Sequence, residues 1–186
     1  DAHYNLAKLY KQMGKPDAAL LTYEHLLSYS PERQDALINM GNIHFDNGAL
    51  DNAIVCFQKA LLANSADKQL TDQANINLAN TYRRQGRDVR AIETYEQVLS
   101  REFHAGLRIK QAMTLPVVYK DHLQINDIRN RLENELVKIA RTNLVVLDPA
   151  LEVASTNFFL AYQAKSNRVL QEKTAELMLK ACPALN

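Results

Sequence analysis

Three asparagines recur in register along the first half of this sequence: Asn5, Asn39 and Asn77. A primary amide both donates and accepts hydrogen bonds, so a column of amides can pair with the backbone of an extended peptide whatever its sequence. We therefore predict a peptide-binding surface, whose other members are polar residues at neighbouring positions: Lys8, Asn42, Asn80 and Arg84. Asparagines so placed can equally serve hydrogen bonds between neighbouring helices, and that alternative stays open.

The remaining residues that could do chemistry form no catalytic pattern. The sequence contains no glycine-rich phosphate loop, no nucleophile elbow and no Walker-type motif. Its five histidines lack the spacing of a metal site. The two cysteines, Cys56 and Cys182, give no disulfide framework, and Cys56 lies on an apolar helical stripe where we expect a buried, reduced thiol. We predict no catalytic residue, no metal and no cofactor in this chain.

Helices must position the asparagines, and residues 36–62 show how. Two helical patterns of apolar residues at three- and four-residue spacing flank a break that contains Gly48. Glycine reaches the left-handed backbone geometry of such a turn at least cost. Gly41 and Ala53 are small residues on facing stripes, which would let two helix axes approach closely. The stretch predicts an antiparallel helical hairpin.

The hairpin occurs three times. A glycine, an alanine and an aromatic residue return 34 residues earlier and 38 residues later, in the sets Gly14, Ala19, Tyr23; Gly48, Ala53, Phe57; and Gly86, Ala91, Tyr95. A period of 34 with this order of small and aromatic residues is typical of the tetratricopeptide repeat, and residues 1–100 resemble that family. The resemblance implies an all-α superhelix whose leading helices line the inner surface, where the asparagines fall. We expect the three aromatic residues to pack between helices.

The predicted fold is therefore an all-α tetratricopeptide superhelix of three hairpins with a C-terminal helical cap. The repeats are assigned to residues 1–34, 35–71 and 72–103, a degenerate capping helix pair to 104–141, and a loop with a final helix to 142–186. The long helix at 121–141 carries an apolar stripe, and its Arg129, Arg131, Glu133 and Glu135 are expected on a solvated face. A loop is expected at 142–158, with a short extended piece at 144–147, followed by a helix at 169–181.

The second half resembles a more particular family. The motifs are LPVVY at residues 115–119, NDIRNRLENEL at 126–136, FFLAYQ at 158–163 and LKACPAL at 179–185. In this order they resemble the segment between repeats and catalytic part in bacterial SPINDLY-like glycosyltransferases, relatives of the O-linked N-acetylglucosamine transferases. The resemblance implies a sugar-nucleotide donor, a protein acceptor and two Rossmann-like lobes. The chain stops at Asn186, about where those lobes would begin, and Tyr162 and Gln163 are candidates for contact with a bound donor.

Two functions follow from these observations. The first is the substrate-recruiting part of a protein glycosyltransferase, whose catalytic region would belong to the same parent chain. The second is a stand-alone adaptor in secretion or complex assembly. The length of the reading frame beyond Asn186 separates them. A third possibility, an enzyme in its own right, is disfavoured by the missing motifs.

Composition narrows the partners to proteins and peptides. A net charge of +1 gives no electrostatic reason to bind nucleic acid or an anionic membrane. No apolar run approaches the roughly 18 residues that indicate a membrane-spanning helix. Nothing resembles a secretion signal, and a cytoplasmic location is expected. The sequence begins at Asp1 without a methionine, which suggests a fragment.

Overall fold

The computed structural model describes residues 2–63, 66–102, 104–156 and 158–185. Within these ranges every regular element is a helix and none is a strand, which confirms the predicted all-α class. Contacts divide the chain into two compact units, Asp1–Gln85 and Gly86–Asn186, and each is described by itself.

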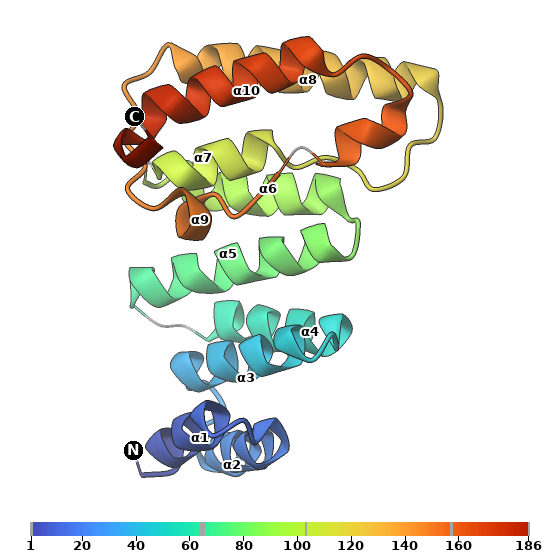
Figure 1. Cartoon of the computed structure of the whole chain (residues 1–186). Helices are drawn as coiled ribbons and strands as arrows, with labels where there is room; N and C mark the ends of the chain where they lie inside the picture. Colours follow the sequence, from blue (N-terminus) through green and yellow to red (C-terminus); the bar gives the residue numbers. More distant parts are fainter. Residues whose placement is uncertain (1, 64–65, 103, 157, 186) are drawn as a thin grey trace. The chain divides into compact units, whose positions relative to one another are not determined.

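Unit 1 contains five helices, two pairs of which form antiparallel hairpins. The helices are α1 (Ala2–Gln12), α2 (Pro16–Tyr29), α3 (Gln34–Asp46), α4 (Leu50–Leu62) and α5 (Lys68–Arg84). Figure 1 shows α1 beside α2 and α3 beside α4, and α5 packs against both α3 and α4. The helices predicted from the repeat are confirmed within a few residues at each end.

Glycine makes the turns within the hairpins. Gly14 has a φ of 68° and Gly48 a φ of 76°, in the left-handed region that side chains with a Cβ disfavour. Pro16 follows the first turn at the first position of α2, where its missing N–H costs no helical hydrogen bond. The sequence prediction of glycine turns is therefore confirmed.

Small residues let the hairpin helices approach each other. Ala7, Ala19 and Ala36 are fully buried, and they pack with Tyr23 and Leu26 in one cluster. Phe57 is also buried, as expected for a packing residue. At Gly41 a Cβ would lie 2.6 Å from Cε1 of Phe57, so Gly41 faces α4, as predicted, and its nearest side chain there is Phe57. Ala53 lies one helical turn away from Phe57 on the same face.

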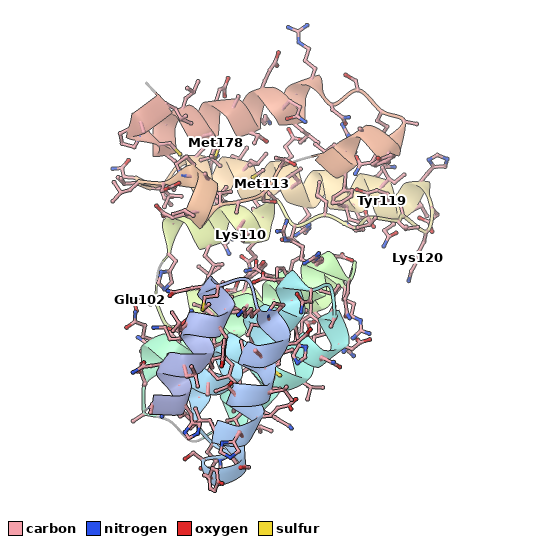
Figure 2. All side chains as sticks on the ribbon, turned by 60° about the horizontal axis from the view of Figure 1, so that its bottom comes forward. Glu102, Lys110, Met113, Tyr119, Lys120 and Met178 are labelled. Carbon is pink, nitrogen blue, oxygen red and sulfur yellow. The ribbon has the colours of Figure 1, made fainter. Side chains whose placement is uncertain are left out.

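Unit 2 contains the remaining helices. They are α6 (Asp88–Leu99), α7 (Ala105–Ala112), α8 (His122–Ala140), the single turn α9 (Pro149–Glu152), the 3-10 helix η1 (Phe158–Gln163), α10 (Arg168–Ala181) and the 3-10 helix η2 (Pro183–Leu185). α8 and α10 run side by side, and α7 packs against α6 and α8 (Figure 1). The loop between α7 and α8 carries Tyr119 and Lys120, which are labelled in Figure 2. Tyr95 on α6 is fully buried, as its place in the repeat predicts.

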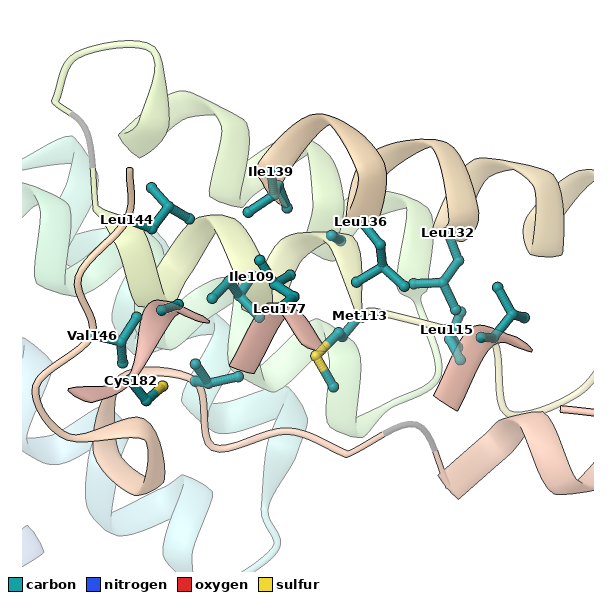
Figure 3. Packing of buried hydrophobic residues seen from close by; sticks show 14 of the residues in the cluster. Ile109, Met113, Leu115, Leu132, Leu136, Ile139, Leu144, Val146, Leu177 and Cys182 are labelled. Atoms are coloured by element: carbon teal, nitrogen blue, oxygen red, sulfur yellow. The ribbon is translucent and has the colours of Figure 1, made fainter. Parts of the chain in front are cut away.

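A single apolar cluster forms the core of unit 2. Leu132, Leu136 and Ile139 project from α8 towards residues of α7 and α10, as Figure 3 shows. These three side chains are at most 3% exposed, which confirms the apolar stripe predicted for the long helix. Leu177 of α10 and Ile109 of α7 close the cluster from the other two helices.

The segment between α8 and α10 differs from the sequence prediction. The expected loop at 142–158 contains α9, which begins at Pro149 and is capped by the Asp148 carboxylate, 3.0 Å from the Leu151 nitrogen. The expected extended piece at 144–147 is not a strand. Its Val146 N–H donates to the Ala181 carbonyl at 2.8 Å, which ties the segment to the end of α10.

The predicted domain boundaries at 103 and 141 stay predictions. The two helices assigned to the third repeat, α5 and α6, fall in different units.

Among the described residues, no helix is both long enough and apolar enough to cross a membrane.

Candidate peptide-binding surface

The seven residues predicted to bind peptide lie on the three leading helices of unit 1. We call this set the polar row: Asn5 and Lys8 on α1, Asn39 and Asn42 on α3, and Asn77, Asn80 and Arg84 on α5. Asn5, Lys8 and Arg84 are exposed, whereas the other four are half-buried. The structure therefore places each predicted residue on the expected helix, but not all of them in solvent.

Hydrogen bonds made by residues of the polar row link neighbouring leading helices. Asn39 Nδ2 donates to the Tyr4 hydroxyl at 2.9 Å, which joins α3 to α1. Asn77 Nδ2 donates to Asn42 Oδ1 at 2.9 Å, which joins α5 to α3. Asn39 and Asn77 therefore make hydrogen bonds between neighbouring helices, the alternative that the sequence left open. Adjacent leading helices are close enough for their polar stripes to meet along the seam between them.

A cation–aromatic pair extends the contact between α3 and α5. The Arg84 guanidinium lies 4.8 Å from the centre of the Phe45 ring, and its Nη1 donates to the Phe45 carbonyl at 2.8 Å. Arg84 thereby covers the end of α3 while its side chain stays exposed. At the same end of α3, Asp46 forms an ion pair with Lys11 of α1 at 3.4 Å.

Tyr4 belongs to this surface, although the sequence analysis did not select it. Its ring lies 4.6 Å from the Arg33 guanidinium, and Arg33 in turn donates to both carboxylate oxygens of Asp35 at 2.9 and 3.3 Å. Partial burial, together with the Asp35 carboxylate, raises the pKa of the Tyr4 hydroxyl, so Tyr4 stays protonated at neutral pH. The repeat register contained a signal, because Tyr4 stands where the later repeats have Ile38 and Ile76.

The amides keep part of their hydrogen-bonding capacity. Each asparagine amide has two N–H donors and a carbonyl acceptor. Asn39 and Asn77 each give one N–H to a neighbouring helix, and Asn42 contributes only its oxygen to these bonds. The same contacts that fix the orientation of the amides leave further donors and acceptors for a ligand.

In unit 2, arginine and glutamine side chains connect elements that are distant in sequence. The buried Gln163 accepts from Arg129 Nη1 at 2.8 Å and donates to the Tyr119 hydroxyl at 2.8 Å. Arg129 also donates to Asn167 Oδ1 at 2.7 Å. The oxygen and an N–H of the Gln163 amide are thus both hydrogen-bonded inside the protein, which contradicts its predicted contact with a bound sugar-nucleotide donor. Tyr162 is 63% exposed.

The other charged residues of α8 are also engaged. Arg131 donates to the Thr114 carbonyl at 2.6 Å, and burial lowers the pKa of its guanidinium. Glu133 pairs with Lys173 of α10, and Glu135 accepts from Arg108 of α7 at 2.8 Å. The prediction of a solvated face was wrong for Arg129, Arg131 and Glu135, because neighbouring elements pack against α8 and supply hydrogen-bonding partners, whereas the Glu133 side chain stays 41% exposed.

A cavity of about 280 Å³ lies among α6, α7 and α8. Ile92, Glu96, Arg108, Gln111, Ala112, Arg131 and Glu135 line it. Gln111 accepts from Arg108 at 2.7 Å and donates to Glu96 at 2.7 Å, so the charged and polar groups around the cavity satisfy one another. We assign no ligand to this cavity.

Both cysteines are free and buried. Burial raises the pKa of the Cys56 thiol to about 11, and it also raises the pKa of Cys182. Raised pKa values keep both thiols protonated at neutral pH, where they are poor nucleophiles. The predicted buried, reduced thiol at Cys56 is confirmed.

Comparisons with known proteins agree with the repeat pattern. Residues 1–33 match one family model and residues 32–101 match another, and both models describe the tetratricopeptide repeat. The fold is similar to that of two crystal structures of MamA. One has a TM-score of 0.61 and 14% identity, covering 94% of this chain and 91% of that chain. The other has a TM-score of 0.58 and 12% identity, covering 96% and 90%.

These likenesses establish the fold alone, because the identities are low. A search of curated protein sequences found no significant match. The comparisons give no support to the resemblance to protein glycosyltransferases.

Proposed function

Because residues 1–101 belong to the tetratricopeptide repeat family, whose domains are generally scaffolds for protein–protein interaction, we propose that the polar row binds an extended segment of a partner protein. The observation that carries the proposal is the pair of asparagine bonds between leading helices, Asn39 to Tyr4 and Asn77 to Asn42. These bonds hold the amides in fixed orientations before any ligand arrives. Binding then loses less side-chain entropy than it would with freely rotating amides.

The chemistry of the polar row suits a ligand of varied sequence. The remaining amide donors and acceptors match the carbonyl and N–H groups that every extended peptide exposes. Lys8 and Arg84 add positive charge at the two ends of the row, where acidic side chains of the ligand would be stabilised. We therefore expect binding of unstructured segments with a preference for acidic ones.

Fluorescence anisotropy with a panel of labelled, unstructured peptides tests this proposal. The variant combines Asn5→Ala, Asn39→Ala and Asn77→Ala, and Asn52→Ala is the matched control, because Asn52 is exposed on the second helix α4. Each neutral hydrogen bond is worth roughly 0.5–1.5 kcal/mol, so the triple variant should bind about 10- to 1,000-fold more weakly. The control should bind normally.

Asn5→Ala alone provides a check that is independent of folding. Asn5 is exposed, so its replacement should leave stability unchanged while weakening binding several-fold. Unaltered peptide binding by a folded triple variant would eliminate the polar row as the binding surface.

A narrower hypothesis concerns the parent protein. We propose, from the motifs at 115–119, 126–136, 158–163 and 179–185, that the chain recruits acceptor proteins for a glycosyltransferase region in the same parent. The chain itself should transfer no sugar, since it lacks phosphate-binding loops and donor lobes. Incubation with labelled sugar nucleotides and acceptor proteins tests this statement. Turnover above a heat-treated control, traced to this polypeptide, would disprove it.

The alternative is a stand-alone adaptor in secretion or complex assembly. The MamA structures share the fold of this chain over about nine-tenths of their own length. Under either hypothesis we propose a cytoplasmic location, in keeping with two free thiols. Affinity purification of the parent protein, followed by mass spectrometry, separates a transferase with glycosylated clients from an adaptor within a stable complex.

A further inference from the structure

Two lysines of α10 reach across to α8 in unit 2. Lys173 forms an ion pair with Glu133, and the Lys180 ammonium donates to the Ala140 carbonyl. The two contacts are seven residues apart on both helices, so α8 and α10 run parallel here (Figure 1). Seven residues are about two helical turns, which separates the two contacts by roughly 10 Å along the helix axes.

A pocket of about 340 Å³ lies between these two contacts. Its lining consists of Leu136, Val137, Ala140 and Arg141 of α8 with Lys173, Glu176, Leu177 and Lys180 of α10. Leu136 and Leu177 form its floor, because both belong to the core cluster of unit 2 and are at most 2% exposed (Figure 3). The volume lies at the lower end of the range of about 300–1,000 Å³ that is usual for small-molecule sites. A pocket of this size with an apolar floor suits the aliphatic or aromatic body of a small ligand.

The charges around the pocket differ between its two ends. At one end, Lys173 is paired with Glu133. At the other end, Arg141 and Lys180 are both exposed. Lys180 donates to a neutral carbonyl, and the Arg141 side chain has no hydrogen bond or ion pair with any described residue. Glu176 offsets one of these two positive charges, so this end of the pocket keeps a net positive charge.

We propose that the pocket binds a small carboxylate with an apolar body several carbons long. The body lies on Leu136 and Leu177, between the two lysines. The carboxylate meets the Arg141 guanidinium, whose planar fork can donate two parallel hydrogen bonds to it. This site lies within unit 2, so the proposal does not rest on peptide binding by the polar row.

Titration of the full chain with octanoate, butanoate and octylammonium, followed by two-dimensional amide NMR, tests the proposal. The amide signals of residues 136–141 and 173–180 should shift most, and they should saturate with octanoate. Each methylene group that leaves water strengthens binding by about fourfold, so octanoate should bind about tenfold more tightly than butanoate or better. Octylammonium has the same body with the opposite charge and should bind about fivefold more weakly than octanoate, or less tightly still.

The chain offers matched variants for each half of the ligand. Arg141→Gln should weaken octanoate binding about fivefold or more, whereas Arg168→Gln, at an exposed arginine of α10 outside the pocket, should stay within about twofold of the wild type. Ala140→Leu fills the pocket and should weaken octanoate binding about tenfold. Its control is Ala175→Leu, because Ala175 is exposed on α10 and does not line the pocket. Circular dichroism confirms that each variant is folded.

The proposal is overturned if octanoate causes no saturable shift at residues 136–141 and 173–180. Equal affinity for octylammonium and octanoate would also overturn it, since the positive end of the pocket would then select no anion. Normal octanoate binding by folded Arg141→Gln and Ala140→Leu would place the ligand elsewhere on the chain.

Discussion

The two units use different contacts to hold their helices together. In unit 1, small residues allow helix axes to approach, as where Gly41 meets the Phe57 ring. In unit 2, long polar side chains bridge elements that are far apart in sequence, as where Arg129 reaches Gln163. Both units bury an apolar cluster, so the difference lies in what fixes the geometry around that core.

Repetition explains this difference. A contact that recurs in each hairpin must use similar residues each time, and it therefore leaves a period of 34 in the sequence. A bond that occurs once, such as the one between Arg129 and Gln163, leaves no period. The comparison predicts that unit 1 is most sensitive to side-chain volume and unit 2 to the loss of charged hydrogen-bond donors.

The largest effect is expected from Arg129→Ala. The substitution leaves Gln163 Oε1 and Asn167 Oδ1 without their donor, and Gln163 is only 1% exposed. Hydrogen bonds to charged groups contribute roughly 1.5–3 kcal/mol each, so the free energy of unfolding of unit 2 should fall by about 3–6 kcal/mol. Hydrogen exchange of residues 158–181, read by mass spectrometry, measures the local change.

Arg168→Ala is the control for Arg129→Ala. Arg168 forms an ion pair with Glu172 at 2.7 Å, but its side chain is 83% exposed. An exposed pair of this kind contributes about 0–1 kcal/mol. Equal loss of protection in the two variants would contradict the idea that Arg129 has a special role in unit 2.

The second effect concerns side-chain volume at Gly41. Gly41→Leu pushes a side chain into the Phe57 ring, and overpacking of this kind costs about 1–3 kcal/mol. The midpoint of thermal unfolding, followed by helical circular dichroism, should therefore drop. Gly41→Ala alone should also lower the midpoint. The double variant Gly41→Ala, Phe57→Leu should recover part of that loss of stability, because leucine leaves room for the added Cβ. An unchanged midpoint in Gly41→Leu would show that the contact with Phe57 is not rigid.

The sequence predicted most of the helices and the three glycine turns, because helical spacing and left-handed turns leave local patterns at Gly14, Gly48 and Gly86. It predicted that Gly41 faces the second helix of its hairpin but not that Phe57 lies nearest, since a stripe defines a helix face and not the height at which two helices meet. It placed the polar row on the right helices. It could not show that Asn77 meets Asn42, because that contact depends on the distance between α3 and α5.

The charged residues of α8 show a second limit of prediction. Arg131 and Glu135 belong to a run of charged residues that is typical of an exposed helix face. In the structure, however, Arg131 donates to Thr114 and Glu135 accepts from Arg108. Their partners lie 17 and 27 residues away in the sequence, outside α8, so the residue spacing within α8 does not reveal them. Only the three-dimensional arrangement brings these groups together.

The third prediction concerns pH and the Cys56 thiol. Burial raises the pKa of Cys56 from 9.0 in the unfolded chain to about 11 in the folded protein. Since the folded pKa is the higher one, the stabilising effect is complete below pH 9 and is lost as the pH rises to about 11. A shift of this size corresponds to roughly 2.7 kcal/mol.

Urea denaturation at pH 8 and pH 10.5 measures this loss. Cys56→Ala removes the titrating group, so its unfolding free energy should fall less between the two pH values than that of the wild type. Tyr23, whose pKa burial raises to about 12, is present in both proteins, and its contribution cancels in the comparison. The same pH dependence in both proteins would show that Cys56 does not titrate as its burial predicts.

The smallest effect separates structure from binding within the polar row. Asn39→Ala and Asn77→Ala each remove a hydrogen bond between leading helices, so each should lower the free energy of unfolding by about 1 kcal/mol. Asn5→Ala removes an exposed amide and should change the free energy of unfolding by less than about 0.5 kcal/mol.

Because Asn42 accepts from Asn77, a double-mutant cycle with Asn42→Ala and Asn77→Ala isolates their coupling. Urea denaturation of the variants, beside anisotropy with the same peptides, gives both quantities. If Asn39→Ala and Asn77→Ala lose stability but keep their affinity for peptide, these two asparagines serve only the packing of repeats, and unit 1 is held by polar bonds as well as by small residues.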